Sequence, residues 1–278
     1  MITIYDDPRV KLARGALGAV RVVHDPTLPP RVLRLVNADG DEFFAKQHSD
    51  RDRYTRELHA YLAWAPNLSG HVPRVVGRQD RTCTLLLTAV PGVRADTVTP
   101  GSPEEEQAHY EAGRVLSKLH RSTTVPRTGA VGTELAQRLR DWIGRADQAD
   151  LISTIECDRL SHHADVLANT LMDSAVCHLD YQPRNWLLGG AFGLCDFEHM
   201  RRDARIRDFT RLEFRRWQAA PNLRTAFFAG YGQPLNHTEQ RLLESFGAIE
   251  AVTALVRGHE QDDLALSTHG RTVMTRLT

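Results

Sequence analysis

One stretch of the sequence, residues 176–200, constrains the fold more than any other. It holds two short apolar runs separated by a Gly-Gly pair. This pattern predicts a β-hairpin with the glycines in its tight turn. Such a hairpin places Asn185, which precedes its first strand, beside Asp196, which follows its second. Asp180 then lies on the loop that leads into the hairpin. The two predicted strands are Trp186–Leu188 and Phe192–Cys195.

These three side chains suit a chemistry of magnesium and phosphate. Mg²⁺ prefers oxygen ligands and usually keeps several of its waters, so we assign Asn185 and Asp196 as its ligands. A carboxylate that is free of the metal can position an attacking hydroxyl group, and phosphoryl transfer depends mainly on positioning and charge neutralisation. We therefore assign Asp180 as the catalytic residue. Each of the three alone would be common in a turn, so the prediction depends on their order around the hairpin.

The motif has the form His-x-Asp-x-x-x-x-Asn, starting at His178, followed by Asp-Phe at 196–197. It resembles the catalytic loop and metal-binding motif of the protein-kinase superfamily. In detail it is most similar to the aminoglycoside phosphotransferase family and its small-molecule kinase relatives. The resemblance implies an α+β, bilobal protein-kinase-like fold. A nucleotide-binding lobe with an antiparallel sheet would span 1–90. A mainly helical lobe with the catalytic loop and the acceptor site would span 91–278.

Departures from the family pattern narrow the range of kinases that the sequence resembles. The family usually has Gly between the His and the Asp of the motif, where this chain has Leu179. Asp196-Phe is followed by Glu198 rather than Gly, and no Ala-Pro-Glu segment follows within the expected reach. These absences argue against a kinase that acts on proteins. Asp208 resembles the aspartate that braces the catalytic loop in the phosphotransferases. His178 is expected to bind backbone near the Asp196 strand rather than to move protons.

The first ninety residues are predicted to be rich in strands. The third of these strands ends at Lys46, and the resemblance implies that this lysine binds the phosphates of the nucleotide. A helix predicted over 50–64 by its apolar spacing carries Glu57, which we pair with Lys46. Glu42 is the alternative partner, and Glu57 would otherwise be a surface residue. The predicted strands are 19–24, 32–36, 42–47, 72–78 and 82–88.

Two further segments are expected to contact the nucleotide. An apolar strand that runs into Pro91-Gly92 resembles the hinge between the lobes of the family. Backbone groups of the hinge would bind the purine edge, so we add Thr88 and Val90 to the nucleotide site. A phosphate-covering loop is expected between the first two strands, and we assign 14–19 to it because small residues let backbone N–H groups approach phosphate.

The rest of the chain is predicted to be mainly helical. We expect 268–278 to be a loose tail. The acceptor is expected to bind between 130 and 173 and after Leu212, where the family varies. The predicted helices are 103–120, with Ser102 as its cap, and 134–146, 161–172, 222–231 and 238–257.

Composition excludes several classes of partner. The 35 basic and 35 acidic side chains balance, so nothing indicates a nucleic acid or a membrane surface as partner. No apolar segment approaches the length that spans a bilayer. The four cysteines form no Cys-x-x-Cys pair, and the N-terminus shows no secretory signal. We therefore expect a cytoplasmic protein with reduced thiols.

The function that these features favour is O-phosphotransfer to a small molecule, with ATP or GTP as the donor and Mg²⁺ as the cofactor. The expected acceptor is an antibiotic of the aminoglycoside or nucleoside type, in a resistance or self-resistance role. A polycationic acceptor requires an acidic site, whereas the segment 201–216 is basic, so a neutral or anionic acceptor is equally open. The alternatives are a metabolic kinase of a sugar or an amino alcohol, and a catalytically silent nucleotide-binding regulatory module.

Overall fold

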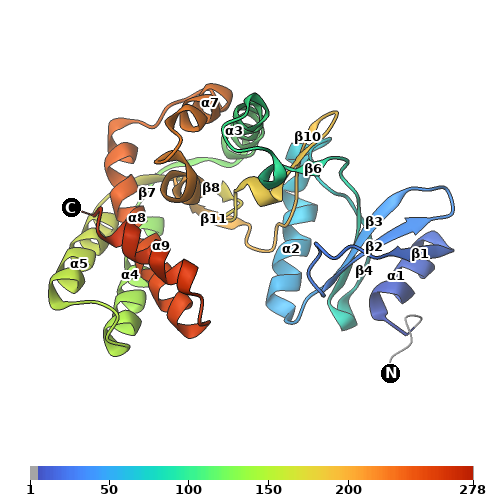
Figure 1. Ribbon diagram of the computed structural model, residues 1–278, viewed down its shortest axis with the longest axis horizontal. Coiled ribbons are helices and arrows are strands. Elements are labelled where there is room, and N and C mark those ends of the chain that lie inside the picture. Colours follow the sequence, from blue (N-terminus) through green and yellow to red (C-terminus); the bar gives the residue numbers. More distant parts are fainter. Residues whose placement is uncertain (1–5, 278) are drawn as a thin grey trace.

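The N-terminal part of the chain is built on a five-stranded antiparallel sheet (Figure 1). The structure is a computed structural model that describes residues 6–277. The strands of this sheet lie in the order β1-β2-β3-β5-β4. The elements are α1 (Pro8–Leu17), β1 (Val20–Val23), β2 (Val32–Asn37), β3 (Glu42–Gln47), α2 (Arg51–Ala63), the 3₁₀ turns Ala65–Leu68 and Asp80–Thr82, β4 (Val75–Gln79) and β5 (Thr84–Thr88).

Alternation along β3 decides which of its side chains face the interior of the molecule. Successive side chains of a strand point to opposite faces of the sheet. Phe43 and Ala45 belong to one buried cluster with Ala13 of α1. Phe44 and Lys46 therefore point to the opposite face, toward α2 and the helical part of the chain.

The predicted hairpin is confirmed and connects the two parts of the chain. Its strands, β9 (Trp186–Leu188) and β10 (Phe192–Leu194), pair antiparallel, with Phe192 opposite Leu188. The short strand β6 (Val93–Arg94) pairs with β9 and completes a small sheet. Gly92 precedes β6 with φ of 143°, and a Cβ there would lie 2.7 Å from the carbonyl oxygen of Leu188. Only glycine fits this approach of two backbones.

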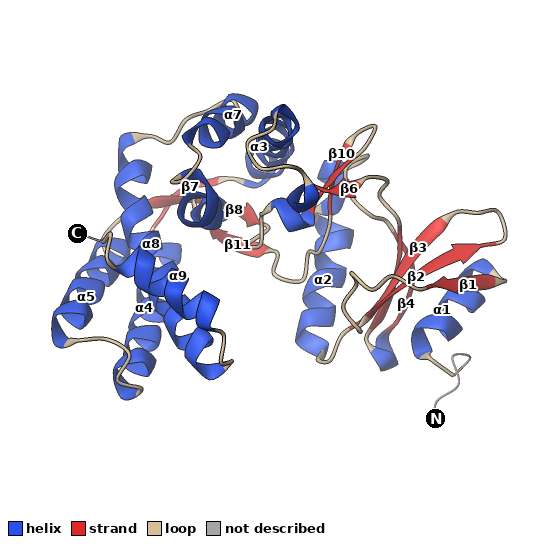
Figure 2. Ribbon diagram, in the orientation of Figure 1, coloured by secondary structure: helices blue, strands red, loops and turns tan. Residues whose placement is uncertain are grey.

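The remainder of the chain is mainly helical, as Figure 2 shows, and carries one more antiparallel sheet, in the order β11-β8-β7. The predicted α+β fold is therefore confirmed. The elements are the 3₁₀ turns Ala95–Thr97 and Pro183–Asn185, α3 (Pro103–Thr123), β7 (Val125–Thr128), α4 (Ala130–Gln148), α5 (Thr154–Ala168), β8 (Met172–Cys177), β11 (Arg201–Ala204), α6 (Arg207–Leu212), the π-helical turn Glu213–Trp217, α7 (Pro221–Tyr231), α8 (His237–Glu260) and α9 (Leu264–Met274).

Side-chain caps fix where several helices begin. Ser102 accepts a hydrogen bond from the backbone N–H of Glu105 at 3.3 Å, which confirms it as the cap of α3. Asp50 caps α2 by accepting from the N–H of Arg53 at 2.8 Å. Such caps satisfy backbone donors that have no partner within the helix. None of the helices among residues 6–277 combines the length and the apolar character that a membrane crossing needs.

Three sequence-based expectations about elements are wrong. The segment 14–19 is not a loop between two strands, because α1 continues to Leu17 before β1 begins, and the loop that joins β1 to β2 is 24–31. The predicted helix 161–172 ends earlier, at Ala168, since the chain then enters β8. Most of 268–278 is ordered by α9 and by Leu277, which is 3% exposed. Residue 278 lies outside the described residues.

Candidate active site

Lys46 lies at the centre of a buried network of charges. Its Nζ is 2.8 Å from Oε2 of Glu57, so the expected ion pair between β3 and α2 is present. The same nitrogen is 2.6 Å from Oδ1 of Asp196 and 3.2 Å from Oε2 of Glu198. The alternative acid, Glu42, is not part of this network and pairs with a neighbouring arginine on β2.

The network keeps Lys46 and Asp196 charged. Burial alone would lower the pKa of Lys46, but the carboxylates of Glu57, Asp196 and Glu198 together raise it above its ordinary value. Burial alone would raise the pKa of Asp196. The ammonium of Lys46 outweighs burial and holds the pKa of Asp196 below its ordinary value. A cation and carboxylates that are paired in this way stabilise one another's ionised forms.

Glu198 and Arg31 are site residues that the sequence motif does not reveal. Glu198 is 5% exposed and, besides Lys46, contacts Arg31, whose Nη1 lies 3.1 Å from its Oε2. Arg31 ends the loop 24–31, which contains no glycine and therefore does not match a glycine-rich phosphate loop. The one signal in the sequence is the carboxylate of Glu198 directly after Asp-Phe, where protein kinases have glycine.

Asp180 is buried on the loop between β8 and the hairpin, and side-chain donors surround its carboxylate. Oδ1 accepts from Nε2 of Gln182 at 2.6 Å and contacts Nη1 of Arg211. Oδ2 accepts from Nη2 of Arg184 and from Nδ2 of Asn185, each at 2.8 Å. These bonds fix the direction of the carboxylate and connect the predicted catalytic residue to the predicted metal ligand Asn185.

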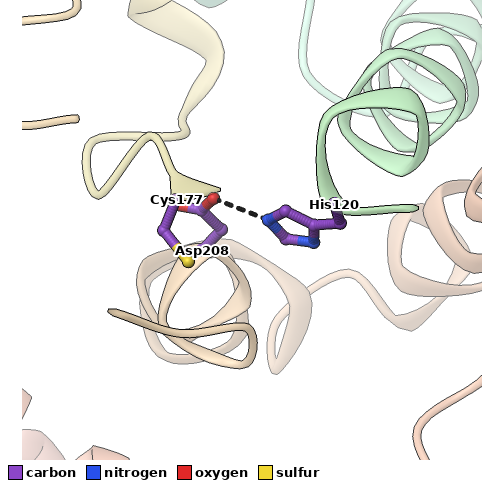
Figure 3. Close-up of side chains that lie close together, drawn as sticks. All are labelled: His120, Cys177 and Asp208. Atoms are coloured by element: carbon purple, nitrogen blue, oxygen red, sulfur yellow. Dashed lines mark hydrogen bonds and ion pairs between the residues drawn. The ribbon is translucent and has the colours of Figure 1, made fainter. Parts of the chain in front are cut away.

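Asp208 on α6 braces the start of this loop, as expected from the sequence. Its Oδ2 accepts from the backbone N–H of His178 at 2.8 Å, and its Oδ1 accepts from that of Leu179 at 2.6 Å. His120 of α3 lies on the other side, with Nε2 3.0 Å from Oδ2 of Asp208, and the thiol of Cys177 is close by (Figure 3).

The trio His120, Cys177 and Asp208 has the spacing of a metal site, but its hydrogen bonds indicate a structural brace. Nδ1 of His120 lies 2.8 Å from the hydroxyl of Tyr231. The Cys177 thiol donates to the carbonyl of Ala204 at 3.4 Å, and burial raises its pKa well above the ordinary value. A protonated thiol is a poor ligand, because the thiolate is the form that binds metals.

Two residues of the motif have left-handed backbone conformations. Leu179 has φ of 63°, at the position where the family usually has glycine, and Asp196 has φ of 66°. Leucine in this conformation costs about 1–2 kcal/mol, and the hydrogen bond from its N–H to Asp208 holds it there. His178 binds the carbonyl of Cys195 through Nε2 at 3.0 Å, which confirms that it contacts backbone at the Asp196 strand.

A cavity of about 380 Å³ opens between the sheet, α2 and the hairpin. The predicted nucleotide and metal residues all line it: Lys46, Glu57, Thr88, Val90, Asn185 and Asp196. The loop 24–31 closes one side. Its remaining wall is partly apolar, with Val32, Phe44, Leu87 and Leu187 among the lining side chains. The cavity therefore joins an apolar slot suited to a planar base to a charged end suited to phosphates.

The two predicted metal ligands fit Mg²⁺ by the chemistry of their free oxygens. The amide nitrogen of Asn185 is committed to the carbonyl and the carboxylate of Asp180, so its amide oxygen remains for a ligand. The side chain of Asp196 is 30% exposed, and within the described residues its ion pair with Lys46 uses Oδ1 and leaves Oδ2 open. An amide oxygen and a carboxylate oxygen on one cavity wall are hard donors of the kind that Mg²⁺ prefers.

A second cavity, of about 340 Å³, lies on the other side of the catalytic loop. Arg211 lines this second cavity and contacts Oδ1 of Asp180, whereas Arg184 lines the first cavity and contacts Oδ2. Asp180 thus lies between the two. Helices α4 and α8, which fall in the regions predicted to bind the acceptor, line the second cavity, whereas no described residue of α5 does.

The sequence matches the model of a known protein family over most of its length. The model of a family described as phosphotransferase enzyme family matches residues 20–243. Among proteins of curated function, none matches the sequence closely enough to count as a relative.

Several solved structures share the fold. The gentamicin complex of APH(2″)-IIa is 14% identical, with a TM-score of 0.63, and the match covers 100% of this chain and 98% of that one. A type I macrolide 2′-phosphotransferase is 16% identical, with a TM-score of 0.66 and the same coverage. A choline/ethanolamine kinase family protein from Mesorhizobium loti is 17% identical, with a TM-score of 0.68, covering 97% of this chain and 92% of that one.

At these identities the solved structures establish the fold, while the family match spans most of the sequence and contains the catalytic loop, the hairpin and Lys46. The chain therefore belongs to the phosphotransferase enzyme family, as a small-molecule kinase that acts on hydroxyl groups.

Proposed function

We propose that the protein transfers the γ-phosphate of ATP or GTP to a hydroxyl group of a small molecule, with Mg²⁺ held by Asn185 and Asp196. One observation carries the proposal: Lys46, Asn185 and Asp196 converge on the charged end of the 380 Å³ cavity, and Asp180 lies beside it. We further propose that residues 1–90 form the nucleotide lobe, that 91–278 form the acceptor lobe, and that the protein acts in the cytoplasm, where nucleotides are available.

In this proposal the first cavity binds the nucleotide. Backbone groups at Thr88 and Val90 bind the base, and the apolar side chains of the cavity contact its two faces. Lys46 neutralises phosphate charge, and Glu57 holds its ammonium in place from α2. When bound, Mg²⁺ would neutralise charge on the β- and γ-phosphates.

Asp180 acts on the acceptor. The hydroxyl oxygen of the acceptor forms a bond to the γ-phosphorus as the bond from that phosphorus to the nucleoside diphosphate breaks. The hydroxyl proton passes to the carboxylate of Asp180, which its neighbours hold in a fixed direction. Catalysis by this arrangement comes mainly from positioning and charge neutralisation, as phosphoryl transfer requires.

The candidate acceptors are an antibiotic of the aminoglycoside or nucleoside type, a sugar and an amino alcohol. Solved structures of this fold include proteins named as aminoglycoside and macrolide phosphotransferases and as a choline/ethanolamine kinase family member. The fold therefore does not select among acceptors, and the charge of the second cavity is the better guide.

The substitution Asp180→Asn tests the proposed role of this residue. Purified protein is supplied with Mg²⁺ and either ATP or GTP, and phosphorylated product is measured by mass spectrometry over a panel of hydroxylated compounds. We expect D180N to lower kcat by about 10²–10⁴-fold, because it removes the proton acceptor, and to retain ADP binding. Asp165→Asn, at an exposed position on α5, is the matched control.

Two results would contradict the proposal. Wild-type turnover by D180N would show that Asp180 does not take the proton. Nucleotide binding by the wild-type protein without transfer to any compound of the panel would favour the catalytically silent regulatory module.

A further inference from the structure

The second cavity has a strongly basic lining drawn from three segments that are distant in the sequence: α4, the adjacent β11 and α6, and α8. Its walls hold five arginines but, within the part of the chain that the structure describes, a single acidic side chain, Glu250. Trp142, Phe246 and Ile249 add an apolar wall. The arginines are Arg138 on α4, Arg201 on β11, Arg207 and Arg211 on α6, and Arg257 on α8.

Glu250 offsets these arginines only in part, because its direct ion-pair partners, Arg215 and His269, lie outside the cavity lining. It lies 2.5 Å from Nη2 of Arg215 and 3.1 Å from Nε2 of His269. Burial would raise the pKa of Glu250, but the hydrogen bond from His269 and the charges of Arg215 and Arg211 outweigh it and lower the pKa to about 2.

The remaining carboxylates near the cavity are too few to balance the arginines. Asp203 is shared by Arg201, at 3.1 Å, and Arg138, at 3.9 Å. Arg207 and Arg257 have no carboxylate within ion-pair distance among residues 6–277. Nη1 of Arg207 is shielded from solvent and has no hydrogen-bond partner there. Positive charges gathered in a cavity with so little compensation favour an anionic occupant.

Seven acidic residues in the segment 134–165 would suit a polycation, but they lie outside the described lining of this cavity. They are Glu134, Asp141, Asp147, Asp150, Glu156, Asp158 and Asp165. A ligand with several ammonium groups would therefore meet guanidinium groups instead of carboxylates.

Arg211 connects this basic lining to the proposed proton acceptor. Its Nη1 contacts Oδ1 of Asp180 while its side chain lines the cavity. An anion bound in the cavity competes for the guanidinium of Arg211. The competition would free one oxygen of Asp180 to receive the proton of the acceptor hydroxyl.

We propose that the second cavity is the acceptor site and that its acceptor is anionic, a hydroxylated small molecule that carries a phosphate or carboxylate group. The inference rests on the proposed function for the reaction, and on the arginine lining for the charge of the acceptor. Arginine presents a planar fork of donors that matches both phosphate and carboxylate. The apolar wall at Trp142 and Phe246 would contact the uncharged part of the molecule.

A matched set of compounds tests the charge preference directly. Wild-type protein saturated with Mg²⁺ and ADP, which occupy the first cavity, is titrated by calorimetry with glucose, glucose 6-phosphate, glucuronate, glucosamine and kanamycin. We expect the two anions to bind more tightly than glucose and the two amines to bind no better than glucose. Raising the salt concentration should weaken the binding of the anions, because salt screens charge. If neither anion binds more tightly than glucose, the proposal is overturned.

Variants of the arginines test whether the anions bind in the second cavity. We expect Arg207→Gln and Arg257→Gln each to weaken binding of the anions by about tenfold or more, the usual loss for a hydrogen bond to a charged group. Arg140→Gln is the matched control on α4, where Arg140 is exposed and pairs with Asp165. Measurements of melting temperature and of ADP affinity distinguish a misfolded variant from one that has lost only the anion site. Arg257 is exposed, so we expect R257Q to keep the melting temperature of the wild type.

The same measurements separate failure of this inference from failure of the proposed function. Transfer of phosphate only to neutral or cationic compounds, unaffected by R207Q, would overturn the anionic acceptor and leave the phosphotransferase standing. Binding of anions that R207Q and R257Q weaken and R140Q does not, without transfer to any of them, would support the anion site while contradicting the proposed reaction.

Discussion

Asp180 and Asp208 are both buried aspartates beside the catalytic loop, but different kinds of donor hold them. Asp208 accepts from two backbone N–H groups, which move only if the loop moves. Asp180 accepts from side chains, among them Arg184 and Arg211, which can swing toward a substrate. Asp208 is therefore suited to fixing the loop, and Asp180 to exchanging partners during a reaction.

This difference predicts a selective effect of Asp208→Asn. The amide keeps the size of the side chain but replaces one acceptor oxygen by an NH₂ group, which faces a backbone N–H. We expect kcat to fall by about tenfold or more, because a buried charged hydrogen bond is lost, while affinity for ADP stays close to that of the wild type. Steady-state kinetics and ADP titration measure the two quantities. Equal losses in both would indicate general unfolding instead of a displaced loop.

Residues that act within one short motif could be predicted from the sequence, and residues brought together by the fold could not. Asp180, Asn185 and Asp196 flank one hairpin, so their spacing indicates their proximity. Arg31 and Arg211 approach the same site from distant segments. Arginine is common on protein surfaces, and no local pattern distinguishes these two from the others.

At the scale of elements, α1 and α9 show how tertiary packing overrides local signals. The glycines of 14–19 suggest a loop, but α1 continues through Gly15 because Val10 and Ala13 are buried against the sheet. The position of 268–278 at the end of the sequence suggests a loose tail, but α9 covers most of it. The backbone of α9 lies so close to α8 that a Cβ on Gly270 would be 2.8 Å from the carbonyl oxygen of Ala251. Such contacts cannot be inferred from propensity.

The packing of α3 on α7 gives a prediction with a matched control. A Cβ on Gly113 of α3 would lie 2.8 Å from the backbone nitrogen of Tyr231 on α7, whereas a Cβ on Gly144 of α4 would meet no atom within 4 Å. We expect Gly113→Ala to destabilise the protein by about 1–3 kcal/mol through overpacking. Gly144→Ala should stabilise it by up to about 1 kcal/mol, since alanine favours the helix.

Chemical denaturation of the two variants measures both free energies of unfolding. Because Tyr231 also contacts His120 behind the catalytic loop, G113A should lower activity as well as stability. Stabilisation of both glycine variants would show that helix propensity, and not the contact between α3 and α7, dominates at Gly113.

At the scale of the whole molecule, the cavities proposed for the two substrates are lined by different parts of the chain. The sheet and the hairpin form the cavity proposed for the nucleotide, and α4, α6 and α8 form the basic one. The bilobal arrangement could be predicted, because the motif and the change from strands to helices both indicate it. The charge of the second cavity could be predicted only in part: the segment 201–216 is visibly basic, but no local pattern shows that Arg138 and Arg257 join it in one cavity.

Glu250 links three segments of the helical part and predicts how the protein responds to acid. It lies on α8 and binds Arg215, in the turn after α6, and His269, on α9. Its pKa falls from 4.5 to about 2 in the folded protein because these partners outweigh the effect of burial. A lowered pKa stabilises the fold above pH 4.5, and this stabilisation, about 3 kcal/mol at most, is lost as the pH falls from 4.5 toward 2.

Glu250→Gln mimics the protonated side chain and tests this expectation. At pH 7 we expect the variant to have the lower free energy of unfolding, and the difference from the wild type should shrink as the pH falls below 4.5, because protonation then removes the same charge from the wild type. Glu106→Gln, at an exposed position on α3, should show little difference at any pH. A difference for E250Q that does not change with pH would mean that packing of the side chain, and not its charge, joins the three segments.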